Sequence, residues 1–528
     1  MTTTDSGSAR PPDWKRRWSF RNPQLREFLW FCAPALLLGL ALRVLMTWQM
    51  PYGYMQFDSA DFLLTIHRFI TKGALTIHGK RTFLVPLLYT LPFVLKIPAL
   101  IVIPIAQHLL GLAVVLMTGV LTRLWLQPWR WVIVPLTLLM AANPNLLWFE
   151  HALMSESVYL FCVFALALAA TLFAKRQSTL HFTLLLLALF FTAAARPEGR
   201  LFLAFGFLLI VLVEWGRWKA LRLRLAWLAG LAFVTLPLTK TYQAGQLLYA
   251  TVLPLAPDES KVAPEFGRQV RPLRDQIRAQ GGVNTELQSL EQKLTDMTGE
   301  YLEAKGERKP DTNSLCQRLA LEACLNRPWA LPPLAARKFL LSNNSPISIG
   351  YNEPRLHQKL IIGFNRKNML NILSKGLVGR DLKDEAAVSD FVLEHYHPFS
   401  WYPFLDDTWA RLTVGLIAGH AGEGPIPPLP VFFMLALAGM AVFLATGGQF
   451  QRFHIAWIVS LSGLWFAVEL TGVVNSRYRF LFEPFCLIYA TLGLALLCLK
   501  MADGFRAVAR RIKCPATPAA DESPSIDR

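Results

Sequence analysis

Paired charges beside the ends of long apolar segments are the residues that could carry chemistry in this chain. Asp58 and Asp61 stand three residues apart just after the first apolar run, in FDSADFLLTIHRFITKG. On a helix, residues at this spacing share a face. Two carboxylates beside a hydroxyl group suit general-base catalysis or the binding of a divalent metal. The spacing is also common on exposed helices, so it indicates a site only together with other residues.

Further charges lie in the same loop and at the ends of later apolar segments. Ionisable groups at membrane depth cost free energy, so each is a candidate substrate-binding residue, as is Asp61. The set holds three carboxylates and six cations: Glu150, Glu156, Glu198, Lys80, Arg81, Arg196, Lys240, Arg477 and Arg479. A single arginine there more often contacts lipid headgroups, and a single glutamate often only complements a helix dipole. Both signs gathered at one membrane face favour a water-facing cavity that holds an anionic ligand.

Membrane-spanning helices are the elements that must position these residues. The 528-residue chain is 53% hydrophobic and 17% charged, whereas soluble domains are about 25% charged. Apolar runs such as 29–48 and 480–499 are long enough to cross about 30 Å of hydrocarbon, where only helices satisfy their own backbone groups. We predict ten spans, near 29–48, 98–120, 132–146, 156–174, 179–195, 200–214, 223–240, 428–447, 454–473 and 480–499. The short run 83–95 favours an interfacial or re-entrant helix over another span.

The basic residues predict the orientation of these spans. With ten spans, the segments rich in Lys and Arg all fall on the cytoplasmic side, as the positive-inside rule requires. This placement accounts for the net charge of +17 without a nucleic-acid partner. The first span follows a long polar lead and no small-residue cleavage site, which is typical of a signal anchor. The candidate site residues then lie at the opposite, outer face.

This orientation divides the chain into five parts and predicts an all-α polytopic membrane protein. Residues 1–28 form a cytoplasmic tail, and residues 29–240 form the N-terminal transmembrane module that would carry the catalytic residues, with its first outer loop at 49–97. Residues 241–427 form a mainly helical extracytoplasmic domain, residues 428–499 the C-terminal transmembrane helices, and residues 500–528 a partly disordered cytoplasmic tail. In the outer domain, Cys316 and Cys324 fall in one predicted helix. Their separation of roughly 12 Å excludes a disulfide and favours free thiols.

The motifs around the candidate residues resemble those of the C-type (GT-C) membrane glycosyltransferase superfamily. The resemblance is strongest to the group of protein O-mannosyltransferases and the bacterial aminoarabinose transferase of lipid A. Four motifs carry it in order: FDSADFLLTIHRFITKG after the first span, MSESVYLF opening the fourth, ARPEGRLFL closing the fifth, and SRYRFLFEP opening the last. Residues 241–427 carry no motif of this family.

The resemblance implies a reaction and roles for individual residues. It implies transfer of a sugar from a polyprenyl-phosphate donor to an acceptor hydroxyl of a protein, lipid or glycan on the outer face, with inversion. Asp58 matches the family's catalytic base. The family's motifs also match Glu156, Arg196, Glu198, Arg477 and Arg479. Ser59 stands where the family often has a second acidic residue. This departure leaves open which residue is the base and whether a divalent metal binds. No other cofactor is expected.

Two other classes of function compete with this interpretation. A transporter or flippase for a lipid-linked or anionic substrate would also need charged residues. Transporters usually place them near the bilayer midplane within repeated bundles, and this sequence shows no internal repeat. A noncatalytic scaffold for envelope assembly would tolerate changes at Asp58, Glu156 and Arg196. For the scaffold and for the enzyme alike, we expect a prokaryotic cytoplasmic membrane.

Overall fold

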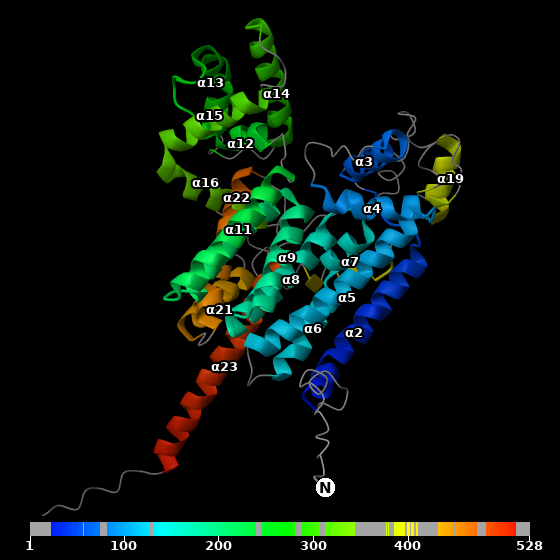
Figure 1. Cartoon of the computed structure of the whole chain (residues 1–528), viewed down its shortest axis with the longest axis vertical. Coiled ribbons are helices and arrows are strands. Elements are labelled where there is room, and N and C mark those ends of the chain that lie inside the picture. The colour runs from blue at the N-terminus through cyan, green and yellow to red at the C-terminus, as the bar shows by residue number, and fades with distance from the viewer. Residues whose placement is uncertain are drawn as a thin grey trace, which may run out of the picture.

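A computed structural model shows the chain as a bundle of helices with further helices at one end (Figure 1). It describes residues 23–55, 58–73, 82–125, 130–238, 244–279, 282, 287–306, 312–343, 376, 378–379, 385–395, 399–401, 403–405, 408–409, 431–446, 450–471 and 482–513. Within these ranges the regular secondary structure is helical, and one isolated β-bridge joins Tyr54 to Ala152.

Four of the described helices are long and apolar enough to cross a membrane. They are α2 (Pro23–Gln49), α5 (Ala99–Trp125), α8 (Glu156–Arg176) and α11 (Trp218–Leu238). Beside them pack α9 (Thr179–Ala195), α10 (Phe202–Val213), α21 (Val431–Thr446), α22 (Gln451–Thr471) and α23 (Glu483–Lys513). The protein is therefore an all-α polytopic membrane protein, as the apolar runs predict, and the count of ten spans stays a prediction.

The predicted third span is wrong as a single helix. Residues 132–146 instead contain the end of a 3₁₀ turn (Arg130–Val132), then α6 (Ile133–Ala141), and the start of α7 (Pro144–His151). Asn143 has an extended backbone, and its side chain accepts hydrogen bonds from the amides of Asn145 and Leu146. Such a cap, followed by proline at the first helical position, starts a new helix. The run is interrupted because this capping signal outweighs its apolar character.

Two other predicted boundaries can be compared with the structure. The run 83–95 forms α4 (Leu84–Val94), an 11-residue helix that lies across the ends of its neighbours (Figure 1). At about 1.5 Å per residue it is too short to span, which agrees with the predicted interfacial or re-entrant helix. Helix α23 continues to Lys513, so residues 500–513 of the predicted cytoplasmic tail are helical, and the boundary of the tail stays a prediction.

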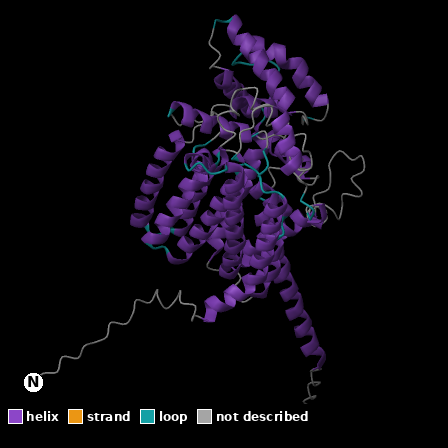
Figure 2. Cartoon of the chain, turned by 90° about the vertical axis from the view of Figure 1, so that its right-hand side faces the viewer, coloured by secondary structure: helices purple, strands orange, loops and turns teal. Residues whose placement is uncertain are grey.

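The described helices of the region predicted as one outer domain pack into two different cores. Residues 244–343 form α12 (Ala244–Val252), α13 (Pro264–Ala279), α14 (Leu287–Ala304), α15 (Thr312–Asn326) and α16 (Leu331–Asn343). These helices surround a hydrophobic core of their own, which includes Phe266 and Leu294, and they stand at one end of the bundle (Figure 2). Helix α19 (Glu385–His395) instead contributes Phe391 to the main core. Cys316 and Cys324 share α15 and are both free thiols, as predicted.

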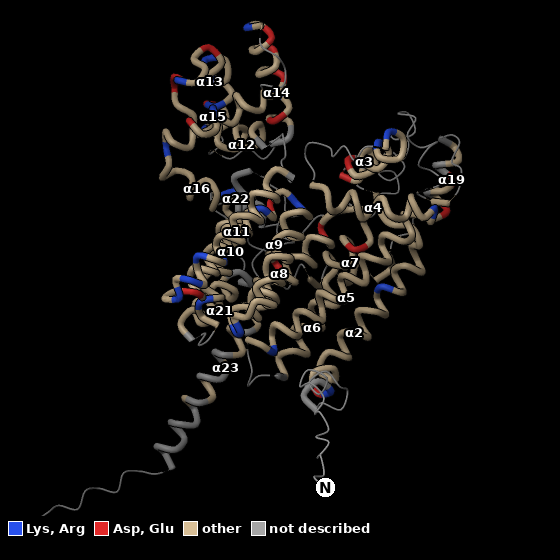
Figure 3. Tube along the Cα trace, in the orientation of Figure 1, with Lys and Arg blue, Asp and Glu red and all other residues tan. Residues whose placement is uncertain are grey.

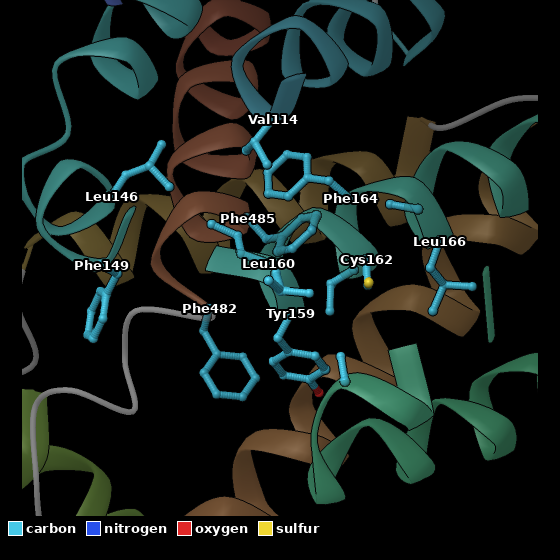
Figure 4. Close-up of a cluster of buried hydrophobic side chains, with 14 of the residues drawn as sticks. Val114, Leu146, Phe149, Tyr159, Leu160, Cys162, Phe164, Leu166, Phe482 and Phe485 are labelled. Atoms are coloured by element: carbon cyan, nitrogen blue, oxygen red, sulfur yellow. The ribbon is translucent and has the colours of Figure 1, made fainter. Parts of the chain in front are cut away.

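An aromatic stack in the main core joins α8 to α23. Phe164 of α8 stacks on Phe485 of α23 with ring centroids 4.6 Å apart. Tyr159 and Leu160, one to two turns nearer the start of α8, lie beside Phe482 in the same cluster (Figure 4). Apolar side chains on both helices thus fix the beginning of α8, where the predicted site residue Glu156 lies.

Candidate active site

The predicted outer elements gather at one end of the bundle. Helices α3 (Ser59–Lys72), α4, α19 and α12–α16 lie at the end opposite the start of α2 and the last turns of α23 (Figure 1). We call this the outer end, after the predicted orientation. Acidic positions appear there on α3 and close to α7 (Figure 3).

Arg196 joins carboxylates from two loops at this end. Its Nη1 lies 2.9 Å from Oε1 of Glu156, and its Nε lies 3.3 Å from Oε2 of Glu198. Nη1 also donates to Oγ of Ser155 at 3.4 Å, and the guanidinium carbon stands 5.8 Å from the centre of the Tyr159 ring. Glu156 is only 3% exposed. We call Ser155, Glu156, Tyr159, Arg196 and Glu198 the Arg196 cluster.

The turn that holds Arg196 follows directly from ARPEG. Arg196 ends α9 in an extended conformation, and Pro197 begins a 3₁₀ turn (Pro197–Leu201) that leads into α10. A Cβ at Gly199 would collide with the backbone carbonyl of Thr192. Proline and glycine therefore bend the chain back on α9, and the bend directs Arg196 and Glu198 toward the start of α8.

The electrostatics of the turn keep Glu198 ionised. Burial alone would raise the pKa of this carboxyl group, but the charge and hydrogen bond of Arg196 outweigh it and hold the pKa below the usual 4.5. Because the pKa of Glu198 is lower in the folded protein, its pairing with Arg196 stabilises the fold at pH values above the usual pKa. This stabilisation is lost as the pH falls through the lowered pKa. At neutral pH Glu198 is therefore a carboxylate beside Arg196. Arg200 adds a second positive charge close to Glu198.

The first outer loop docks on the loop between α7 and α8. Tyr54 makes two backbone hydrogen bonds with this loop: its amide donates to the His151 carbonyl at 2.9 Å, and its carbonyl accepts from the Leu153 amide at 2.8 Å. Ser59 Oγ donates to the Leu153 carbonyl at 2.9 Å. Leu153 stands only three residues before Glu156. The beginning of α3 and the Arg196 cluster are therefore held by one short stretch of chain.

Asp58 and Asp61 both lie at the beginning of α3. Asp58 immediately precedes the helix, and its carbonyl accepts a hydrogen bond from the Asp61 amide at 3.1 Å. Asp61 sits in the first turn, and both residues are half-buried. The predicted helix thus begins one residue after Asp58, so Asp58 occupies its cap instead of its face. The other predicted site residues Lys80, Arg81, Lys240, Arg477 and Arg479 lie outside the described residues.

Glu150 is held deep in the bundle. It belongs to α7 instead of a loop, and its carboxylate accepts from Nη2 and Nε of Arg43 at 2.6 and 2.7 Å. His108 Nδ1 stands 2.8 Å from the same carboxylate. Arg43 was not selected as a site residue from the sequence. An arginine inside the first apolar run is nevertheless a signal of a functional or structural partner.

Glu483 is a second residue that the sequence prediction missed. It stands in the first turn of α23, within the motif SRYRFLFEP, and is buried. The indole Nε1 of Trp409 donates to its carboxylate. From this motif the sequence prediction selected only the arginines. Glu483 is a carboxylate at a helix end, which is the same signal that identified Glu156.

The described groups include donors suited to phosphate and acceptors suited to hydroxyl groups. Carboxylates accept hydrogen bonds from hydroxyl groups, and arginines bind phosphate through two parallel donors. The Arg196 cluster and Arg200 offer both kinds of group within one turn. Among the residues that the structure describes, no three His, Cys, Asp or Glu side chains converge as metal ligands.

Comparisons with known proteins find similarity to solved structures at low sequence identity. No family model matches the chain, and no curated protein sequence matches it. The oligosaccharyltransferase of Archaeoglobus fulgidus in its apo form is similar over 92% of this chain and 52% of its own, with 14% identity and a TM-score of 0.41. ArnT from Cupriavidus metallidurans bound to undecaprenyl phosphate is similar over 84% of this chain and 77% of its own, with 13% identity and a TM-score of 0.31.

The similar structures belong to the superfamily that the sequence motifs resemble. Both are C-type glycosyltransferases. The chain spans about half the length of the oligosaccharyltransferase.

Proposed function

We propose that this protein is an integral membrane glycosyltransferase that moves a sugar from a polyprenyl-phosphate donor to an acceptor hydroxyl. The observation that carries the proposal is the docking of the first outer loop on the α7–α8 loop. Through the contact of Ser59 with Leu153, the turn that holds Asp58 and the loop that leads to Glu156 meet at the outer end. A carboxylate for proton removal and an arginine for phosphate thus belong to one assembled region.

The proposed reaction assigns one task to each side chain. The Asp58 carboxylate takes the proton of the acceptor hydroxyl as its oxygen attacks the anomeric carbon of the sugar. The bond from that carbon to the phosphate oxygen breaks, and its electron pair leaves with the polyprenyl phosphate. Attack from the face opposite the phosphate inverts the configuration. A positioned base contributes about 10²–10⁴-fold to the rate.

Arg196 and Arg200 would act on the leaving group. The negative charge that develops on the phosphate is costly at a membrane edge, and arginines that are already in place stabilise it without reorganisation. Glu156 and Glu198 keep Arg196 in position and could accept hydrogen bonds from sugar hydroxyls. The predicted cations Lys80, Arg81, Lys240, Arg477 and Arg479 would add to the same phosphate site. The polyprenyl chain would lie in the surrounding bilayer, on the extracytoplasmic side of a prokaryotic cytoplasmic membrane.

A transfer assay tests this proposal. Purified protein in nanodiscs is incubated with radiolabelled polyprenyl-phosphate sugars, one sugar at a time, and with a membrane extract that supplies protein, lipid and glycan acceptors. We expect label from at least one donor to appear in an acceptor fraction. No transfer from any donor by folded protein would contradict the proposal. Movement of unreacted donor across proteoliposomes would then support the transporter alternative.

A further inference from the structure

A network of buried charged and polar side chains lies within the bundle, beneath the candidate site. It consists of Arg43 on α2, His108 on α5, and Glu150 and His151 on α7, and we call it the Glu150 network. All four side chains are buried, between 0% and 4% exposed. Burying ions in this way costs free energy unless they are paired and hydrogen-bonded. The Glu150 network is not needed for the proton and phosphate steps proposed above.

Each end of the Glu150 network is fixed by backbone groups. Arg43 Nη1 donates to the carbonyls of Gly39 and Ala141 at 3.0 and 3.4 Å. At the other end, His151 Nε2 stands 3.2 Å from the carbonyl of Tyr52. A carbonyl can only accept, so this histidine nitrogen donates. The network therefore runs from the interior of α2 and the end of α6 to the first outer loop.

A direct chain of contacts links the two histidines to the carboxylate. His108 Nδ1 lies 2.8 Å from Oε2 of Glu150, and His108 Nε2 lies 3.2 Å from Nδ1 of His151. Glu150 already accepts from two nitrogens of Arg43, so it is an acceptor toward His108 as well. Any displacement of the Glu150 carboxylate would therefore disturb His108, then His151, and then Tyr52.

The seven residues from Glu150 to Glu156 are tied along their length. His151 and Leu153 are bonded to Tyr54 of the first outer loop, and Leu153 also accepts from Ser59. The Met154 carbonyl accepts from the Tyr89 hydroxyl of α4. Arg196 contacts the last two residues, as described above. The same stretch thus begins in the Glu150 network and ends in the Arg196 cluster.

We infer that Arg43, His108, Glu150 and His151 are positioning residues, which fix the first outer loop relative to the α7–α8 loop and so set Asp58 against the Arg196 cluster. The inference rests on the proposed function for its kinetic consequence. Its structural consequence, the holding of the Tyr54–Leu153 contact, can be measured without any substrate.

Gly111 offers a way to disturb the network without changing a charge. A Cβ at this position on α5 would overlap the Glu150 carboxylate, so Gly111→Ala forces that carboxylate to move. Gly230→Ala on α11 is the matched control, because its Cβ would meet no atom within 4 Å. His151→Phe is a second variant, which keeps an aromatic ring and removes both ring hydrogen bonds.

Amide hydrogen exchange gives the first measurement on the intact protein in nanodiscs. We expect Gly111→Ala and His151→Phe to speed exchange in the peptides that contain Tyr54 and Leu153, whose amides make the loop contact. Peptides from α13 should exchange as in the wild type, and Gly230→Ala should change neither region. Unchanged exchange at Tyr54 and Leu153 in both variants would overturn the inference.

Steady-state kinetics give the second measurement. Small misplacements of reacting groups cost about 10- to 100-fold in rate, so both variants should lose that factor in kcat while the donor KM changes by less. If the variants fold and exchange faster but keep the wild-type kcat, the Glu150 network has only a structural role. That result would overturn the inference that its residues position the site. If the wild type transfers no sugar, the proposed function fails, and the exchange experiment still decides whether the network holds the loop.

Discussion

At the scale of single residues, Arg196 is the point where the outer loops meet. The motifs MSESVYLF and ARPEGRLFL selected Glu156, Arg196 and Glu198 from the sequence. The structure brings the three within hydrogen-bonding distance. The sequence could not show that Glu150 pairs with Arg43, because a partner 107 residues away depends on how α2 and α7 pack.

Replacing Arg196 by lysine tests the need for its forked geometry. Arg196→Lys keeps the positive charge but cannot hold Glu156 and Glu198 from two nitrogens at once. We expect kcat/KM for the donor to fall about 10- to 100-fold, measured by initial rates of transfer. Arg268→Lys, at an exposed position on α13, is the control and should transfer like the wild type. Equal rates for both variants would remove Arg196 from the donor site.

The pH dependence of transfer should report the pairing of Arg196 with Glu198. In the wild type the arginine holds the pKa of Glu198 below 4.5. In Arg196→Gln the remaining effect of burial raises that pKa, so the loss of activity on the acid side should begin at a higher pH. The measurement is the pH profile of kcat/KM, with Arg268→Gln as control. If kcat/KM begins to fall at the same acidic pH in Arg196→Gln and Arg268→Gln, the Glu198 carboxylate has no role in transfer.

At the scale of elements, the apolar runs predicted most helices but missed the break between α6 and α7. An apolar stretch satisfies the length rule whether it contains one helix or two. The break depends on AANPN, in which Asn143 caps and Pro144 opens the second helix. That signal is local and readable from the sequence. The prediction that α4 is an interfacial or re-entrant helix was easier, because its length alone excludes a span.

The cap on α7 can be tested by comparing two substitutions. Asn143→Ala removes the acceptor for the amides of Asn145 and Leu146, and should lower the free energy of unfolding by about 1 kcal/mol. Asn143→Ser retains a capping oxygen and should lose much less. Reversible denaturation in mixed micelles measures both. Because α7 carries Glu150 and His151, the alanine variant should also transfer more slowly. Equal stability of the two variants would show that the cap does not hold α7.

At the scale of the whole molecule, the predicted cytoplasmic end holds a buried carboxylate with two arginine partners. Glu214, at the end of α10, is buried and paired with Arg217 and Arg224, and these lie at the predicted cytoplasmic end. The sequence predicted the helical character of 241–427 from composition. It could not predict that one part builds its own core while α19 joins the main one, because that division depends on which apolar faces meet.

Thiol labelling tests the orientation of the whole chain. Arg268→Cys on α13 and Lys219→Cys on α11 replace exposed side chains at the two ends. An impermeant maleimide should label the first in intact cells and the second only after permeabilisation, above the signal of the wild-type cysteines. The reverse pattern would place the candidate site in the cytoplasm.

The most direct test of the account compares two aspartates in the transfer assay. Asp58→Asn removes the proposed base, and Asp296→Asn on exposed α14 makes the same chemical change far from the site. We expect Asp58→Asn to lose about 10²–10⁴-fold in the rate of sugar transfer while remaining folded in nanodiscs, and Asp296→Asn to transfer like the wild type. Full transfer by Asp58→Asn would contradict the assignment of this site as the catalytic centre.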